Sequence, residues 1–184
     1  GDITQKAAVD LMEKHFGAWQ RKGIKAEIPP PATKLKGGIY HLAKDIPQSV
    51  VVTGQFAPAK ASADFHPFTV LDFILGSGGF PSHLFQEIRT NQGLAYSTGS
   101  FYRARSGYGV FGTYAMTKWE TTGKVASLLL SIVEKAKREP IKSKELTWAK
   151  KSINDSFIFS FTSTEQVARQ QLMLEFDNLP RDYL

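Results

Sequence analysis

The sequence predicts an α+β domain in which a mixed, mainly antiparallel sheet is covered by helices on one face. The chain has 184 residues, of which 42% are hydrophobic, so it is long enough to bury a core. Two β-rich runs near its middle are separated by a short turn, which predicts a hairpin. Segments with helical periodicity stand on both sides of that hairpin. The predicted order is helix, linker, two strands, two helices, hairpin and three helices.

The N-terminal part is predicted to be a helix followed by a linker. Apolar residues recur at helical spacing over Thr4–Phe16, where Thr4 can cap the helix and Gly17 can end it. The prolines at 29–31 enforce an extended backbone, and neighbouring lysines keep that stretch in water. The predicted division is therefore a helix at 1–17, a Pro-rich linker at 18–37 and a domain at 38–184.

Two strands and two helices are predicted next. Strand-like composition occurs at Ile39–Leu42 and Ser49–Phe56, and the second run is nearly continuously apolar, as is typical of a central strand. Phe65–Leu75 has helical spacing and is apolar almost all round, which predicts burial against the sheet. A glycine-rich turn, Gly76–Gly79, then leads into a short helix, and Pro81 suits the first position of that helix.

The hairpin follows a glycine that is predicted to end this short helix. Gly93 is placed where a left-handed residue usually stops a helix. The hairpin strands are predicted at Leu94–Arg103 and Tyr108–Met116. Because side chains alternate along a strand, Tyr96 is expected on the same face as Thr98.

Three helices are predicted to complete the chain. Thr117 is a candidate cap for a long helix that reaches Arg138, and Ser143 is a candidate cap for the next one. A last helix is expected from Ser163 or Thr164 to Asp177.

Charge and composition exclude several classes of function. The net charge is +6, but the densest basic run is interleaved with Glu134, Glu139 and Glu145, which is typical of the solvated faces of helices. No basic stretch carries aromatic residues at stacking spacing, so nucleic-acid binding is not predicted. No apolar run approaches the roughly 20 residues of a membrane span.

The ends of the chain and its lack of cysteine bear on its origin. The sequence opens with GDIT, without an initiator Met, which suggests a fragment or a processed chain. With no cysteine it has neither a disulfide nor a thiolate site, a composition that fits many bacterial exported proteins. On this composition alone, we expect a bacterial periplasmic or exported protein.

No metal, nucleophile or phosphate motif is present. The histidines, His15, His41, His66 and His83, are not spaced so that two share one face of a helix, so no zinc site is predicted. No Gly-x-Ser-x-Gly elbow occurs, and GSGG lacks the Lys-Ser/Thr ending of a phosphate-binding loop. Anion binding by the free amides at the helix start near Pro81 is a weaker alternative.

Arg89 and Tyr96 are the candidate site residues. A guanidinium offers a planar fork of donors to carbonyl or carboxylate oxygens, and a tyrosine hydroxyl can donate one directed bond to an oxyanion. A helix end and a strand start are expected to hold the two side chains. From the residues alone, two interpretations stay open: a binding pair, or a solvated helix-end arginine beside a packing tyrosine.

The block ILGSGGFPSHLFQEIRTNQGLAYS resembles the second-half signature of the M16 peptidases, which include pitrilysin, insulysin and the mitochondrial processing peptidase. That signature is a glycine-rich turn, then Ser-Arg-Leu-Phe, then Arg, then Gly-Leu-Ala-Tyr. The opening GDIT…HFGAW resembles the stretch that closes the first half of such proteins, so the resemblance covers essentially the whole chain.

The resemblance implies a role for this chain in a two-part zinc metallopeptidase. In the family two related halves close on a peptide, and the first half binds zinc through His-x-x-Glu-His and a later Glu. The second half has no metal and supplies an Arg and a Tyr to the substrate. These roles fall on Arg89 and Tyr96, whose separation of seven residues matches the family spacing. The resemblance thus implies catalytic and substrate contacts from this pair, and no metal or cofactor in this chain.

The sequence departs from the family pattern at two points, and these departures bear on whether the chain is active alone. His83 stands where the family has Arg, and no His-x-x-Glu-His occurs, so the chain is expected to be inactive alone and to need a zinc-bearing half, in its parent chain or in another subunit. By the resemblance, 1–17 closes the preceding half, and further strands and a helix should follow Leu184. An alternative function is a catalytically inactive M16-like scaffold or assembly subunit.

Overall fold

The computed structural model describes residues 2–20, 23, 36–180 and 182–183. The chain divides into two compact units, Gly1–Ala32 and Thr33–Leu184, and each is described by itself. Within the described residues, no helix is both long and apolar enough to cross a membrane.

The first unit contains helix α1 (Gln5–Phe16), which confirms the predicted helix. The hydroxyl of Thr4 accepts a hydrogen bond from the amide of Ala7 at 3.2 Å, and Gly17 follows the last turn. None of the helix residues is buried, and its apolar side chains, Val9 and Leu11 among them, are exposed. Most of the predicted Pro-rich linker, namely 21–22 and 24–35, lies outside the described residues.

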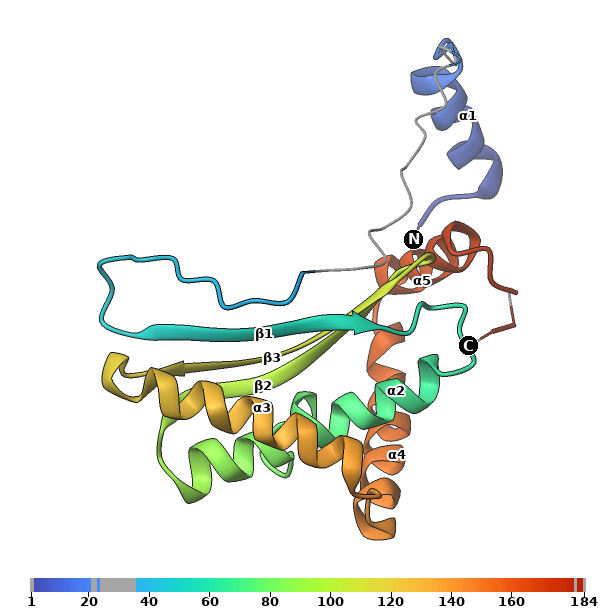
Figure 1. The fold of residues 1–184 in the computed structure, drawn as a ribbon. Coiled ribbons are helices and arrows are strands. Elements are labelled where there is room, and N and C mark those ends of the chain that lie inside the picture. The colour runs from blue at the N-terminus through green and yellow to red at the C-terminus, as the bar shows by residue number, and fades with distance from the viewer. Residues whose placement is uncertain (1, 21–22, 24–35, 181, 184) are drawn as a thin grey trace. The chain divides into compact units, whose positions relative to one another are not determined.

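The second unit is built on a three-stranded antiparallel sheet in the order β1-β3-β2 (Figure 1). The strands are β1 (Ser49–Ala57), β2 (Ala95–Ala104) and β3 (Gly109–Thr117). β2 and β3 form the predicted hairpin, and Thr113 of the middle strand lies opposite Thr53 on one side and Ser100 on the other. The hydroxyls of Thr53 and Thr113 are 2.7 Å apart, which satisfies two polar groups on the covered face of the sheet.

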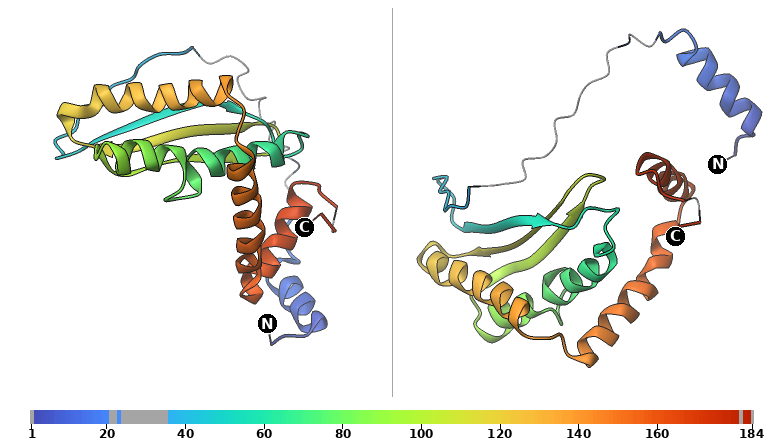
Figure 2. Two further views of the ribbon diagram at one scale, coloured as in Figure 1. Left: turned by 90° about the horizontal axis from the view of Figure 1, so that it is seen from below. Right: turned by 45° about the vertical axis from the view of Figure 1, so that its right-hand side comes forward.

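Helices cover one face of this sheet (Figures 1 and 2), which confirms the predicted α+β fold class. Two of them contain π-helical turns, which the spacing of apolar residues did not predict. The helical elements of this unit are α2 (Phe65–Asp72), η1 (Phe73–Ser77), η2 (Phe85–Asn91), η3 (Trp119–Thr121), α3 (Thr122–Arg138), α4 (Ser143–Phe157), η4 (Ile158–Phe161) and α5 (Thr164–Phe176).

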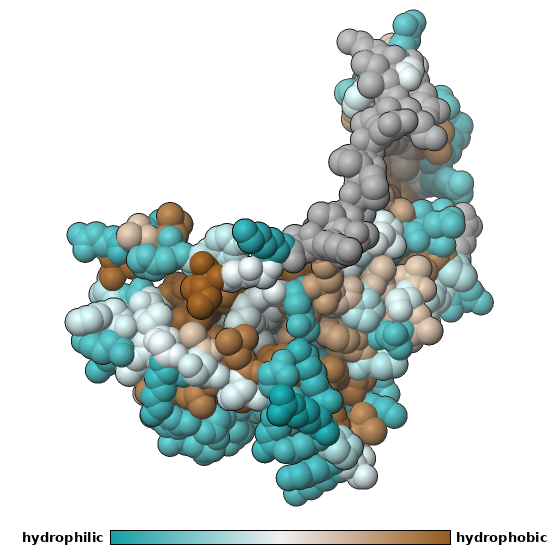
Figure 3. Space-filling model, in the orientation of Figure 1, coloured by the Kyte–Doolittle hydropathy of each residue, from teal (hydrophilic) through white to brown (hydrophobic). Residues whose placement is uncertain are grey.

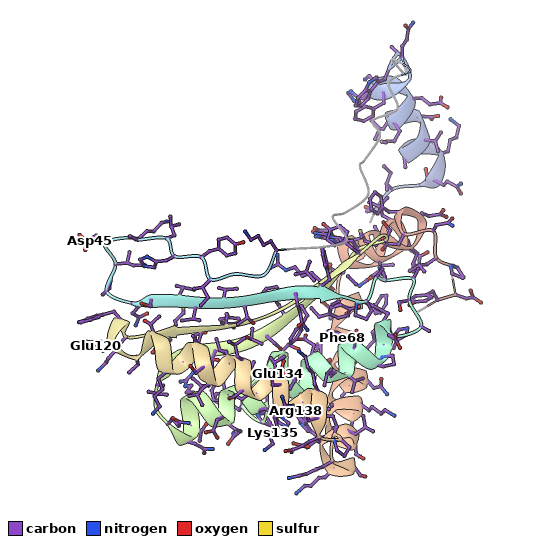
Figure 4. All side chains as sticks on the ribbon, in the orientation of Figure 1. Asp45, Phe68, Glu120, Glu134, Lys135 and Arg138 are labelled. Carbon is purple, nitrogen blue, oxygen red and sulfur yellow. The ribbon has the colours of Figure 1, made fainter. Side chains whose placement is uncertain are left out.

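The hydrophobic core lies between the sheet and these helices. Its buried members come from the helix that contains η2 and from β2, β3 and α3, namely Leu84, Ile88, Ala95, Ala115, Val125 and Leu129. Phe68 of α2, labelled in Figure 4, packs its ring against those of Tyr102 and Phe111 at 4.8 and 5.5 Å between centroids. The half-buried Phe68 thus packs α2 on two strands, and the buried apolar residues of the predicted helix, Ile74 and Leu75, lie in η1.

The basic run of α3 is a solvated helix face, as predicted. Lys137 pairs with Glu134 at 2.6 Å, and Lys135 pairs with Glu139 at 3.7 Å. Figure 4 labels Glu134, Lys135 and Arg138 on this side of α3. Because acidic partners one helical turn away offset the lysines, the run is not an extended cationic patch.

Two strand predictions are wrong. Ile39–Leu42 forms no strand, and the side chains of Ile39, Tyr40 and Leu42 are exposed. β1 is an edge strand of the described sheet instead of a central one, with Val50 and Val52 exposed on the face that carries no helices. Apolar surface gathers near β1 in Figure 3. The apolar composition of β1 indicates only that its side chains suit burial. A central position also requires a second neighbouring strand, which composition does not predict.

Several helix starts also differ from the prediction. Pro81 lies in the turn before the helix, which begins at His83. α3 begins at Thr122, because the hydroxyl of Thr117 donates to the carbonyl of Leu94 at 2.6 Å instead of capping the helix. The cap of α4 is Lys142, one residue before Ser143.

Candidate functional site

The glycine-rich segment before the site packs directly on strand β2. Gly76 lies within the π-helical turn η1, and a Cβ added there would lie 2.3 Å from the backbone nitrogen of Ser100. The buried carboxyl of Asp72 accepts a hydrogen bond from the hydroxyl of Ser100 at 2.5 Å. Burial raises the pKa of Asp72, and the hydroxyl of Ser100 opposes that rise. These contacts fix η1 against β2.

A tight turn at 79–82 then leads into the helix that contains η2. The hydroxyl of Ser82 donates to the carbonyl of Gly79 at 2.6 Å, and Gly79 has a φ of +74°. The side-chain amide of Gln86 donates to the carbonyl of Phe80 at 2.6 Å. Leu84 and Ile88, both fully buried, anchor the helix in the core and leave Arg89 on its half-exposed side.

Gly93 ends η2, as predicted. Its φ of +61° is in the left-handed region, its amide donates to the carbonyl of Arg89 at 3.1 Å, and the next amide, of Leu94, donates to Ile88 at 2.9 Å. The chain therefore passes from the end of η2 at Asn91 to the start of β2 at Ala95 within four residues.

Replacing Gly93 with alanine is expected to lower the free energy of unfolding by about 1 kcal/mol, because a Cβ is unfavourable in the left-handed region. Nothing lies within 4 Å of the new Cβ, so no steric clash adds to the cost. Urea denaturation measures the change. Gly123→Ala, in α3 and equally open, is the control and should stabilise the protein by up to about 1 kcal/mol. A Gly93→Ala variant with unchanged stability would contradict the assignment of Gly93 to the left-handed region.

A β-bulge places Tyr96. Ala95 pairs with Thr117 but Ser97 pairs with Met116, so Tyr96 is the extra residue of the bulged strand. Ala95 and Thr98 are both buried, whereas the side chain of Tyr96 is 76% exposed. The expectation that Tyr96 shares a face with Thr98 is therefore wrong, because the extra residue interrupts the alternation of side chains.

The structure brings Arg89 and Tyr96 together. The Cζ atom of Arg89 lies 5.1 Å from the ring centroid of Tyr96 and 4.8 Å from that of Phe85. Two aromatic rings thus flank the guanidinium, which limits its rotamers while its edge donors stay available. Within the described part of the chain, Arg89 forms no ion pair and the Tyr96 hydroxyl forms no hydrogen bond.

Two contributors to this region were missed in the sequence. Phe85 precedes Arg89 by four residues, a spacing that places side chains side by side on a helix and could have revealed the stack. Glu87 is bound by Gln92 and Asn91, and the hydrogen bond from Gln92, followed by that from Asn91, lowers its pKa. The Glu87 carboxylate therefore accepts its hydrogen bonds from side chains at the C-terminal end of the same helix.

His83, which stands where the resemblance expects Arg, joins η2 to α4. Its Nε2 atom lies 2.6 Å from Oε1 of Glu145, whose other oxygen accepts the amide of Lys142 at 3.2 Å. The hydrogen bond with His83 is the main cause that lowers the pKa of Glu145. One carboxylate therefore fixes the start of α4 and holds it to the helix that carries Arg89.

His83→Ala is expected to lower the free energy of unfolding by about 1 kcal/mol at pH 7, since the pair is partly exposed. Because the pKa of Glu145 is lowered on folding, its contribution is present above the unfolded pKa of about 4.3 and is lost as the pH falls through the folded value. Urea denaturation at pH 7 and pH 3 should show the difference from the parent protein shrinking. His41→Ala, exposed and outside any helix, serves as the control. An equal difference at both pH values would rule out the pair.

A groove of about 550 Å³ lies between η2 and α3 on another side of the same helix. Its walls include His83, Glu87 and Ile132, and neither Arg89 nor Tyr96 lines it. Arg89 and Tyr96 thus lie outside this groove, and the side chain of Tyr96 is exposed. Among the described residues, no group of three or more His, Cys, Asp or Glu could hold a metal ion, so the side chains seen here do not fit a zinc site.

Comparison with known proteins gives consistent matches. The profile of the family described as Peptidase M16 inactive domain matches residues 1–153. An uncharacterized zinc protease of Mycobacterium bovis is 29% identical over 161 residues, which cover 86% of this chain and 36% of that protein. The chain therefore spans little more than a third of the length of that relative.

Solved structures share the fold. The crystal structure of a peptidase M16 inactive domain from Pseudomonas fluorescens is 25% identical, with a TM-score of 0.84 over 100% of this chain and 43% of that chain. The periplasmic protease PqqL from Escherichia coli, 15% identical, has a TM-score of 0.66 over 96% of this chain and 20% of its own. Since the family profile covers most of the sequence, the chain belongs to the M16 peptidase family, in which it matches the inactive domain.

Proposed function

We propose that this inactive domain is the substrate-binding, non-zinc half of an M16-type zinc metallopeptidase. Arg89 and Tyr96 contact the peptide and stabilise the oxygen of the scissile carbonyl as negative charge develops on it. The zinc is supplied by a separate half, in the same parent chain or in a partner subunit, because the described residues offer no ligand set. The names of relatives, such as the uncharacterized zinc protease of Mycobacterium bovis, support this division.

The observation that carries the proposal is the convergence of two unpaired donors. The guanidinium lies 5.1 Å from the tyrosine ring, and neither side chain has a polar partner in the described part of the chain. Donors held in place before substrate binds need little reorganisation when charge develops. The core residues Leu84 and Ile88 behind η2, and the bulge that turns Tyr96 outward, provide this rigidity.

The work of the pair is binding, positioning and electrostatic stabilisation. The planar fork of Arg89 orients a carbonyl oxygen, and the Tyr96 hydroxyl donates a second bond from another direction. Neither group gains or loses a proton in this role, because each acts only as a hydrogen-bond donor.

We also propose that α1 belongs with the zinc-bearing half. Val9, Leu11, Met12 and Phe16 are exposed on a helix with no buried residue, so its apolar side needs a surface to cover it. On this proposal, 1–17 closes the preceding half and 18–37 links it to the domain at 38–184.

The test is peptide hydrolysis by the chain assembled with the zinc-bearing half of its parent. The chain alone should be inactive, the assembly should hydrolyse peptides, and Arg89→Ala should lower its turnover strongly. If both Arg89→Ala and Tyr96→Phe reduce turnover by less than about threefold, the assigned role is wrong, because that loss is under 1 kcal/mol. A folded assembly that hydrolyses no peptide would favour the alternative function, an inactive scaffold subunit.

A further inference from the structure

An exposed aromatic side chain extends the row of rings at Arg89. Phe80 is 70% exposed, and its ring lies 4.6 Å from that of Phe85, in an edge-on arrangement. Phe85 in turn lies against the guanidinium of Arg89, which lies against Tyr96. Three consecutive contacts thus run from Phe80 to the donors of the proposed site.

The turn that carries Phe80 is fixed in place. Its carbonyl accepts the side-chain amide of Gln86 at 2.6 Å, and Ser82, fully buried, ties the turn to Gly79. Pro81 restricts the backbone on the other side of Phe80. An exposed ring on so constrained a turn loses little conformational entropy when a partner covers it.

The spacing of this row fits an extended peptide. Successive residues of an extended chain advance about 3.3 Å, and every second side chain points to the same side. The contacts from Phe80 through Phe85 to Arg89 are each under 5 Å, so the exposed ring lies within about three residues of a carbonyl held by Arg89.

We propose that Phe80 is a specificity-determining residue that receives a large apolar side chain of the peptide, two or three residues from the scissile bond. This inference rests on the proposed function and adds to it a preference among peptides. An aromatic or long aliphatic side chain would cover the exposed ring edge-on, whereas alanine would leave it in water. The preference for phenylalanine over alanine at that one position should be about tenfold in kcat/KM.

The experiment compares two peptide series in the assembled enzyme, with phenylalanine or alanine at each position near the scissile bond. Phe80→Ala should abolish the preference at one position, so that the ratio of kcat/KM for the phenylalanine and alanine peptides falls from about ten to about one. Phe80→Leu should retain part of the preference. Phe159→Ala, which removes a ring that is 68% exposed elsewhere on the domain, is the matched control and should change nothing.

The outcomes separate this inference from the proposed function. Loss of the Arg89 or Tyr96 donors lowers turnover of every peptide by a similar factor, whereas loss of Phe80 changes the ratio between the phenylalanine and alanine peptides. An unchanged ratio in Phe80→Ala overturns the inference even if the donors act as proposed. NMR of the chain with labelled phenylalanine is a second readout, in which the phenylalanine peptide should shift the Phe80 ring signals and the alanine peptide should not. Equal shifts with both peptides, or none with either, would also overturn it.

Discussion

Tyr96→Phe is expected to lower the turnover of the assembled peptidase about a hundredfold, which corresponds to about 2.7 kcal/mol in the barrier. The change removes one hydroxyl and keeps the ring that lies 5.1 Å from the guanidinium of Arg89. A donor that strengthens as charge develops acts mainly on the transition state. The loss should therefore appear in kcat, with KM changed little.

The controls for this variant are favourable because Tyr96 is exposed. Its hydroxyl has no hydrogen-bond partner in the described part of the chain, so the free energy of unfolding should change by less than about 0.5 kcal/mol. Tyr108→Phe, at the far end of the hairpin, is the matched control and should keep full turnover. A Tyr96→Phe enzyme with wild-type kcat would remove the hydroxyl from the mechanism.

Gly76→Ala is expected to lower the free energy of unfolding by about 3 kcal/mol, the upper range for overpacking a core. The new Cβ would lie 2.3 Å from the nitrogen of Ser100 and 2.7 Å from the carbonyl carbon of Gly99, both backbone atoms. No rotamer change can relieve such a contact, so η1 must move away from β2. The hydrogen bond between Ser100 and the buried Asp72 would then lengthen.

Thermal unfolding measures this change, and 3 kcal/mol should lower Tm by roughly 10 °C in a domain of this size. Gly54→Ala is the control, because nothing lies within 4 Å of a Cβ at that position of β1. It should change stability by less than about 0.5 kcal/mol. A Gly76→Ala protein with an unchanged Tm would mean that η1 and β2 are less closely packed than the contacts indicate.

Local patterns predicted the elements that depend on local physics. The spacing of apolar side chains, the hydroxyl of Thr4 before α1 and the left-handed Gly93 each act within one helical turn, so the sequence predicted these helix ends correctly. The hairpin was predicted for the same reason, from two β-rich runs and the turn between them.

Features set by distant residues could not be predicted. His83 and Glu145 are 62 residues apart, and nothing in either neighbourhood indicates that they meet. The edge position of β1 depends on which strands lie beside it, which its composition does not report. Chemistry and the resemblance together singled out Arg89 and Tyr96, whose side chains do lie side by side, while their role stays a prediction.

The bulge at Tyr96 has a consequence for how sequence length can vary near the site. The register of β2 with β3 is regular from Ser97 onward, and the extra residue is absorbed before that point. The bulge can therefore absorb a change in the length of the chain. An insertion or deletion between Gly93 and Tyr96 should alter where the tyrosine points without displacing Thr98 or Ser100 from the core. We expect that relatives with one residue more or fewer at this bulge keep the same hairpin.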